Sequence, residues 1–73
     1  MRKYAIVIEQ GEHNLSAYVP DLPGCITTGR TAAEIEQNIR EAIELHLAGL
    51  REDGEPIPEP HTEVTYIELP GAA

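Results

Sequence analysis

Residues 31–53 form the one stretch of this chain with apolar residues at helical spacing, which limits the fold to a single helix packed on strands. At about 100° per residue, apolar side chains gather on one stripe of this helix and charged side chains on the opposite stripe. Thr31 and Glu34 fit a capping box at its start, and Gly54 is a natural stop at its end. The stripe that we expect to be buried consists of Ala32, Ile35, Ile39, Ala42, Ile43, His46, Leu47 and Leu50.

The rest of the chain predicts four short strands. Residues 3–9 and 15–19 are rich in β-branched and aromatic side chains and flank a polar loop with one glycine, which is typical of a hairpin. Residues 25–28 predict a third strand, after residues 22–25 have placed Pro and Gly at the two central positions of a type II turn. Residues 63–69 predict a fourth strand, which a proline-rich connector separates from the helix.

This order, β-β-β-α-β, contains no repeated βαβ unit. It predicts an α+β fold with one domain spanning residues 1–73, in which the helix lies on one face of an antiparallel sheet. A chain of 73 residues with one cysteine buries a thin core and forms no internal disulfide, so we expect a homo-oligomer, either a dimer or a tetramer. Because the first strand is apolar on both faces and Leu45 lies off the buried stripe, Ala5, Val7 and Leu45 are the predicted oligomer contacts.

The charge balance narrows the classes of partner. Thirteen acidic and 5 basic residues give a net charge of −8, which argues against unaided binding to nucleic acid and favours a basic protein partner. No stretch approaches the roughly 20 apolar residues of a membrane span, and the first residues do not fit a cleavable signal peptide. We therefore expect a cytoplasmic protein with no membrane partner.

The side chains best suited to chemistry have structural interpretations. We interpret Cys25 as a buried structural cysteine, His46 as a partly buried helix residue, and Asp21 as a turn residue whose side chain caps nearby backbone N–H groups. An alternative is a metal-dependent nuclease in which Asp21 and Glu9 meet at strand ends and hold a divalent ion. A further alternative is a solitary oligomeric module for regulation or ligand sensing. We expect no enzyme activity, no cofactor and no metal.

Residues 19–25, Val-Pro-Asp-Leu-Pro-Gly-Cys, resemble the HicB family of bacterial and archaeal antitoxins. Three further segments resemble the family's pattern and follow in the same order as in the family. They are the first strand at residues 4–9, the Gly-x-Thr start of the helix at residues 29–31, and the Gly-x-Pro-Ile-Pro sequence at residues 54–58. The resemblance covers about residues 3–60, which is most of the chain.

The resemblance implies a partial RNase-H-like fold without nuclease activity. It also implies binding to HicA, a small basic toxin that cleaves mRNA, so that the antitoxin covers the toxin's active site. Many members carry a C-terminal DNA-binding domain, and since no such pattern follows here we expect a short form without direct DNA binding. The residues to which we carry over a structural or partner-contact role are Tyr18, Pro20, Asp21, Leu22 and Pro23.

Overall fold

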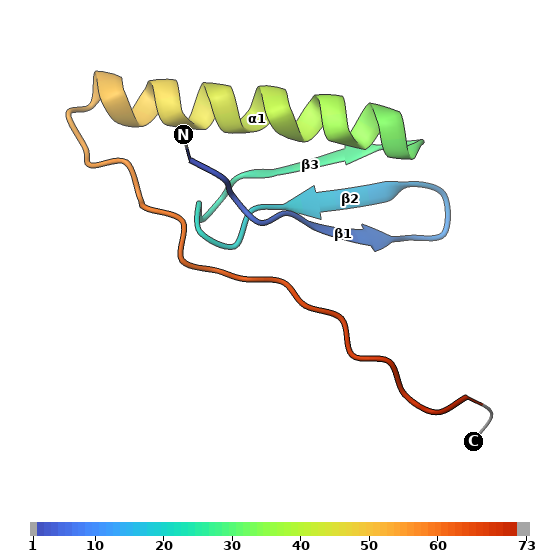
Figure 1. Ribbon diagram of the computed structural model, residues 1–73. Helices are drawn as coiled ribbons and strands as arrows, with labels where there is room; N and C mark the ends of the chain where they lie inside the picture. The colour runs from blue at the N-terminus through green and yellow to red at the C-terminus, as the bar shows by residue number, and fades with distance from the viewer. Residues whose placement is uncertain (1, 72–73) are drawn as a thin grey trace.

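The computed structural model describes residues 2–71 and contains three antiparallel strands and one helix (Figure 1). In chain order these are β1 (Val7–Gln10), β2 (Leu15–Tyr18), β3 (Ile26–Gly29) and α1 (Ala32–Glu52). The strands lie side by side in the order β1-β2-β3, and each neighbouring pair is antiparallel. Helix α1 packs on one face of this sheet, against β3 and β2. The predicted α+β class, with an antiparallel sheet and a helix on one face, is confirmed.

The loop between β2 and β3 contains the predicted type II turn. The N–H of Cys25 donates to the carbonyl of Leu22 at 3.0 Å, and Gly24 takes a φ of 86°, in the region that glycine enters without steric cost. The N–H of Val19 donates to the carbonyl of Cys25 at 3.1 Å. Residues 19–25 therefore form a small closed loop at one end of the sheet.

Both ends of α1 are capped as the sequence predicts. The Thr31 hydroxyl accepts from the N–H of Glu34 at 3.1 Å, and the Glu34 carboxylate reaches back to the N–H of Arg30 at 3.1 Å, one residue before the usual capping-box partner. At the other end Gly54 takes a φ of 69°, and the N–H groups of Gly54 and Glu55 return to carbonyls of the last turn. This is the Schellman arrangement, which satisfies carbonyls that would otherwise lack partners.

The core lies between α1 and the inner face of the sheet. Its buried apolar residues are Ala17, Val19, Leu22, Cys25, Ile35 and Ile39. The apolar stripe of α1 is buried unevenly, since Ile35 and Ile39 are buried, the later stripe residues are half-buried, and Ala32 is exposed. Burial of Ala32 was therefore a wrong prediction. The later stripe residues lose cover because α1 extends beyond the ends of the strands (Figure 1).

At Gly29, the last residue of β3, the sheet and the helix approach each other closely. A Cβ atom built at this position would lie 3.0 Å from the backbone N of Ile35 and 3.1 Å from its Cα. A larger residue would therefore push α1 away from the sheet, at the point where Ile35 enters the core.

The starts of two strands differ from the prediction, and the ends of all three differ by one residue. Strand β1 begins at Val7, which pairs with Tyr18, and not at residue 3. The preceding residues have no pairing partners because β2 ends at Tyr18, where Pro20 lacks an N–H group and the chain turns away. Strand β3 begins at Ile26, since the backbone of Cys25 closes the preceding loop.

The predicted fourth strand is wrong: among the residues that the structure describes, 63–69 pair with no strand. We call residues 55–62 the connector and residues 63–71 the tail. The connector crosses from the end of α1 past the N-terminal residues, and the tail then runs away from the sheet (Figure 1). The observed order is therefore β-β-β-α followed by an extended C-terminal segment.

Within residues 2–71, no helix combines the length and the apolar character needed to cross a membrane.

Candidate functional site

Asp21 lies inside the closed loop of residues 19–25 and is 4% exposed. Its Oδ2 atom accepts hydrogen bonds from the backbone N–H groups of His61 at 2.9 Å and Thr62 at 3.0 Å. Its Oδ1 atom accepts from the Thr62 hydroxyl at 2.5 Å. One buried carboxylate thus fixes the end of the connector, which lies 40 residues further along the chain.

Asp21 caps backbone N–H groups as predicted, but these groups belong to His61 and Thr62 and not, as expected, to residues near Asp21 in the sequence. Two N–H groups of the turn are already occupied, since that of Leu22 donates to the carbonyl of Val19 at 3.1 Å and that of Cys25 donates to Leu22, while Pro23 has no N–H group. The carboxylate is therefore left to pair with distant donors. Sequence reasoning missed Thr62 and His61, because backbone N–H donors leave no mark in a sequence.

The same hydrogen bonds set the charge state of Asp21. The bond from the Thr62 hydroxyl has the largest effect and lowers the pKa of this carboxyl. Burial acts in the opposite direction, while the two backbone N–H donors and the His61 imidazole lower the pKa further. The net pKa lies below its usual value, and the His61 Nε2 atom is 3.2 Å from Oδ1, so this contact becomes an ion pair when the imidazole is protonated.

Two further contacts hold the connector against the N-terminal residues. The Tyr4 hydroxyl donates to the carbonyl of Pro58 at 2.6 Å. The guanidinium of Arg2 lies 3.1 Å from the carboxylate of Glu59, in an exposed ion pair. Together with Asp21, these residues place the connector along the side of the body and determine where the tail begins.

The carboxylates proposed for a metal-dependent nuclease do not come together. Glu9 pairs with Ser16 near the hairpin, whereas Asp21 follows the opposite end of β2, so their predicted meeting at strand ends is wrong. In the part of the chain that the structure describes, no group of three or more His, Cys, Asp and Glu residues could hold a metal ion.

The cysteine and the helix histidine lie where the sequence predicts. Cys25 is buried in the core, and burial raises the pKa of its thiol, which disfavours the reactive thiolate. His46 is half-buried on the inner side of α1.

An apolar row crosses the outer face of the sheet, on the side away from α1. The strand register aligns Val7 with Tyr18 and Tyr18 with Ile26. Tyr18 is 40% exposed and Ile26 is 63% exposed. Sequence reasoning did not single out Ile26, although its place in the alternation of the third strand is a signal that could have found it.

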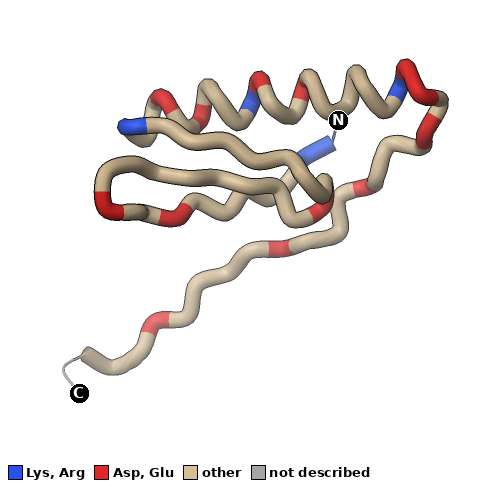
Figure 2. Tube along the Cα trace, turned by 180° about the vertical axis from the view of Figure 1, so that it is seen from behind, with Lys and Arg blue, Asp and Glu red and all other residues tan. Residues whose placement is uncertain are grey.

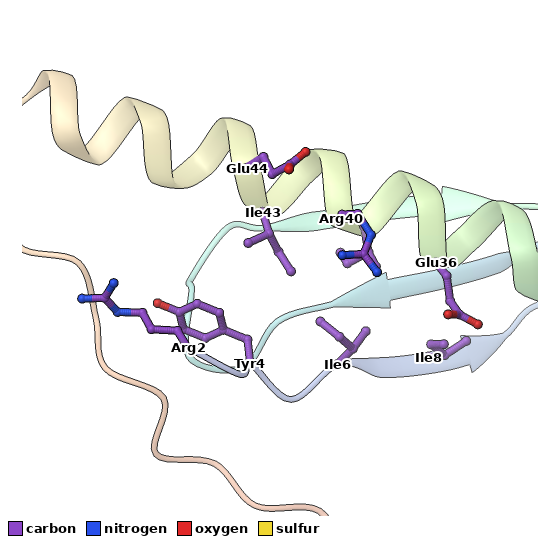
Figure 3. Close-up of a pocket in the computed structure, with 9 residues that line it drawn as sticks. Arg2, Tyr4, Ile6, Ile8, Glu36, Arg40, Ile43 and Glu44 are labelled. Carbon is purple, nitrogen blue, oxygen red and sulfur yellow. The ribbon is translucent and has the colours of Figure 1, made fainter.

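An open groove of about 500 Å³ lies between β1 and α1 (Figure 3). Its apolar lining comes from one side of the first strand region and from the facing side of the helix, as Tyr4, Ile6, Ile8, Ile39 and Ile43. Arg2, Glu36, Arg40 and Glu44 bring charged groups to its edges. The prediction that Tyr4, Ile6 and Ile8 share one face agrees with their common position in this groove.

Acidic side chains are spread over much of the rest of the surface. Figure 2 shows them along α1, at the hairpin between β1 and β2, and around the end of the helix. The five basic residues are too few to balance the thirteen acidic ones. The surface therefore presents mainly negative charge to an approaching partner.

Comparison with known proteins assigns this arrangement to a family. The family model described as the HicB-like antitoxin of bacterial toxin-antitoxin systems matches residues 4–71. The chain belongs to this HicB-like antitoxin family. The resemblance in residues 19–25, the loop that encloses Asp21, is thereby confirmed.

Individual relatives of this HicB-like chain extend across phage, bacteria and archaea. An uncharacterized 14.9 kDa protein from the rep-hol intergenic region of Haemophilus phage HP1 is 39% identical over 67 residues, which are 92% of this chain and 50% of the phage protein. This chain thus spans about half the length of that relative. A UPF0150 protein of Thermoplasma acidophilum is 39% identical over 62 residues, which cover 84% of this chain and 90% of the relative.

A solved structure is similar in both sequence and fold. A chain in the HicA3 and HicB3 toxin-antitoxin complex is 35% identical, with a TM-score of 0.72 over 82% of this chain and 70% of the other. The likeness extends to the arrangement of three antiparallel strands and one helix described above.

The residues predicted to contact a partner of this HicB-like chain differ in how far they are buried. Tyr18 and Pro23 are exposed and Pro20 is half-buried, whereas Asp21 and Leu22 are buried. Asp21 and Leu22 thus position the loop from within, and the side chains accessible to a partner are those of Tyr18, Pro20 and Pro23.

Proposed function

We propose that this chain binds a HicA-type mRNA-cleaving toxin and neutralises it by covering the toxin's active site. The observation that carries the proposal is the likeness to a chain of the HicA3 and HicB3 complex, with a TM-score of 0.72 and 35% identity. The family match over residues 4–71 supports the same role. The action is stoichiometric binding, with no catalytic step or cofactor contributed by the antitoxin.

The apolar row and the loop beside it form the contact surface of this proposal. Tyr18 offers a large amphipathic side chain, of a type that often dominates the binding energy of interfaces. Ile26 on the neighbouring strand and Pro23 in the loop between the two strands extend this exposed surface. The net charge of −8 attracts a basic toxin over longer distances and speeds its association.

Co-expression with a HicA-type toxin tests the proposal. We expect the wild-type chain to restore growth and to co-purify with the toxin. The variant Tyr18→Asp places a charge in the centre of the contact and should weaken binding by at least about tenfold, measured by calorimetry. The control Ala33→Asp adds the same charge at an exposed position of α1 and should bind normally. Absence of any complex would refute the proposal and favour a solitary regulatory module.

We further propose that the antitoxin acts in the cytoplasm as a homo-oligomer, without direct contact to nucleic acid or membrane. Leu45 is 76% exposed on α1, and Ala5 and Val7 are half-buried beside the edge of the sheet. The exposure of these apolar side chains supports their assignment as oligomer contacts, because a second subunit packed on them would bury them.

A further inference from the structure

We propose that the tail supplies the missing fourth strand to a second copy of this chain. Residues 63–69 of one copy add to the free edge of β1 in the other, and the two copies exchange their tails reciprocally. This assembly concerns the chain alone and does not depend on toxin binding.

The tail has the composition of a strand that is buried on both faces. Tyr66 is 90% exposed and its neighbour Ile67 is 76% exposed, and adjacent residues of an extended chain point to opposite sides. Val64 shares a side with Tyr66, and Leu69 shares a side with Ile67. Apolar residues on both sides of an extended segment are typical of a strand covered from two directions.

Strand β1 provides the receiving edge. Within residues 2–71, β1 pairs with β2 along one edge and with no strand along the other. The apolar groove lies between this strand and α1, with Ile6 and Ile8 on the strand side and Ile43 on the helix side (Figure 3). A strand added to the edge of β1 would hydrogen-bond to its backbone and place alternate side chains over this groove.

Charge at the groove suits the tail. Arg2 and Arg40 lie at the groove of a chain with only 5 basic residues, and the tail carries Glu63 and Glu68. An incoming tail therefore brings carboxylates toward Arg40, and toward Arg2 in competition with its partner Glu59, although Glu36 and Glu44 also line the groove.

Two observations favour a second copy over the chain's own tail. The hydrogen bonds of Asp21 fix residues 61 and 62, and from there the tail diverges from its own β1 in both views (Figures 1 and 2). Pairing within one chain would also bury only the side of the tail that faces the groove, and the apolar residues on its other side would stay exposed to water. Reciprocal exchange brings a second subunit to the other side and closes the assembly by two-fold symmetry.

Sedimentation equilibrium of the full chain tests the role of the tail. We expect the wild type to have twice the mass of one chain. The variant Ile67→Pro removes a backbone N–H group and should weaken dimerisation at least about tenfold, whereas Ile67→Val preserves the strand and should remain dimeric. A wild type that remains a monomer at about 100 μM, or an unchanged dimer of Ile67→Pro, would overturn the proposal.

The receiving edge is tested by a matched pair of charged variants. Ile8→Asp places a carboxylate beside the groove and should yield monomers. Ile26→Asp makes the same change on β3, at the opposite edge of the sheet, and should leave the dimer intact. Circular dichroism of both variants establishes that they remain folded, since both residues are exposed in the wild type. Dimers of equal strength in both variants would overturn β1 as the receiving edge.

Crosslinking separates exchange between copies from pairing within one chain. A photoreactive benzoylphenylalanine replaces Tyr66, and the products are separated by mass before peptide analysis. We expect the peptide of residues 4–10 to be crosslinked in the dimer band. The same crosslink found in the monomer band alone would show that the tail folds onto its own β1, and would overturn exchange while leaving toxin binding unaffected.

Discussion

The sheet–helix body and the C-terminal segment are held in place in different ways. The body, residues 2–54, encloses a core of fully buried apolar side chains, such as Leu22 and Ile35. The connector is attached to this body by polar contacts to Asp21, Tyr4 and Arg2. No residue of the tail belongs to the core cluster of the described chain.

The stability of the body and the attachment of the C-terminal segment therefore depend on different interactions. Burial of apolar surface stabilises the body whatever the position of the tail. The polar contacts contribute less to global stability, but they respond to pH and to single substitutions. The C-terminal segment can therefore be released or redirected while the body remains folded, and the following predictions test this separation from the largest expected effect to the smallest.

Truncation of the core should have the largest effect. Leu22→Ala removes a fully buried side chain and should lower the free energy of unfolding by about 2–5 kcal/mol. Ile57→Ala in the half-buried connector should cost about 1 kcal/mol. Urea denaturation measures both, and equal costs would show that the connector is part of the core.

Overpacking of the body should come second. Gly29→Ala brings a methyl group against the backbone of Ile35 and should cost about 1–3 kcal/mol. Gly49 in α1 has no atom within 4 Å of an added Cβ, so Gly49→Ala should stabilise the protein by about 0.5–1 kcal/mol. Thermal unfolding compares the two, and a neutral Gly29→Ala would mean that the helix can move away from the sheet at no cost.

Acidification should release the connector before it unfolds the body. The pKa of Asp21 is lower in the folded chain than its value of about 3.9 in an unfolded chain. Its contribution to stability is therefore fully present above pH of about 4, and is lost as the pH falls through the lower, folded pKa. The amide signals of His61 and Thr62 in NMR spectra should shift in this range, ahead of those of Ile35.

The variant Asp21→Asn provides the control for this titration. It should expose the amides of His61 and Thr62 to hydrogen exchange at neutral pH and abolish their acid-dependent shift. Persistence of the same shift in Asp21→Asn would assign the titration to another group.

Loss of the exposed ion pair should have the smallest effect. Arg2→Ala removes the contact with Glu59 and should change the free energy of unfolding by less than about 1 kcal/mol, with a smaller change at high salt. Urea denaturation at low and high salt measures this effect. A larger cost would indicate that Arg2 holds the connector as firmly as Asp21 does.

Features that obey local rules could be predicted from the sequence. The helix caps at Thr31 and Gly54, the type II turn at residues 22–25 and the hairpin before Leu15 depend on residues only a few positions apart. The family resemblance depends on the same local motif. The class of fold and the functional family were accessible for this reason.

Features that depend on distant pairing could not be predicted. The Thr62 hydroxyl meets Asp21 from 41 residues away, and nothing in either local sequence identifies the other. The tail has a strand-like pattern, but a strand also needs a neighbour, and β1 within the same chain does not provide it. The short extent of β1 likewise follows from Pro20 in the opposing segment, and not from the residues before Val7 themselves.

The hydrogen bonds of the buried Asp21 carboxylate can form only at a late stage of synthesis of the chain. Translation delivers the N-terminal residues first, so Asp21 emerges well before His61 and Thr62, its only donors in the described chain. Until then the carboxylate has no partners, and burying it would be costly. In a nascent or truncated chain that ends before His61, we therefore expect the Asp21 carboxylate to be solvated by water instead. The hydrogen bonds at Asp21 thus form only once residues 61 and 62 have been synthesised.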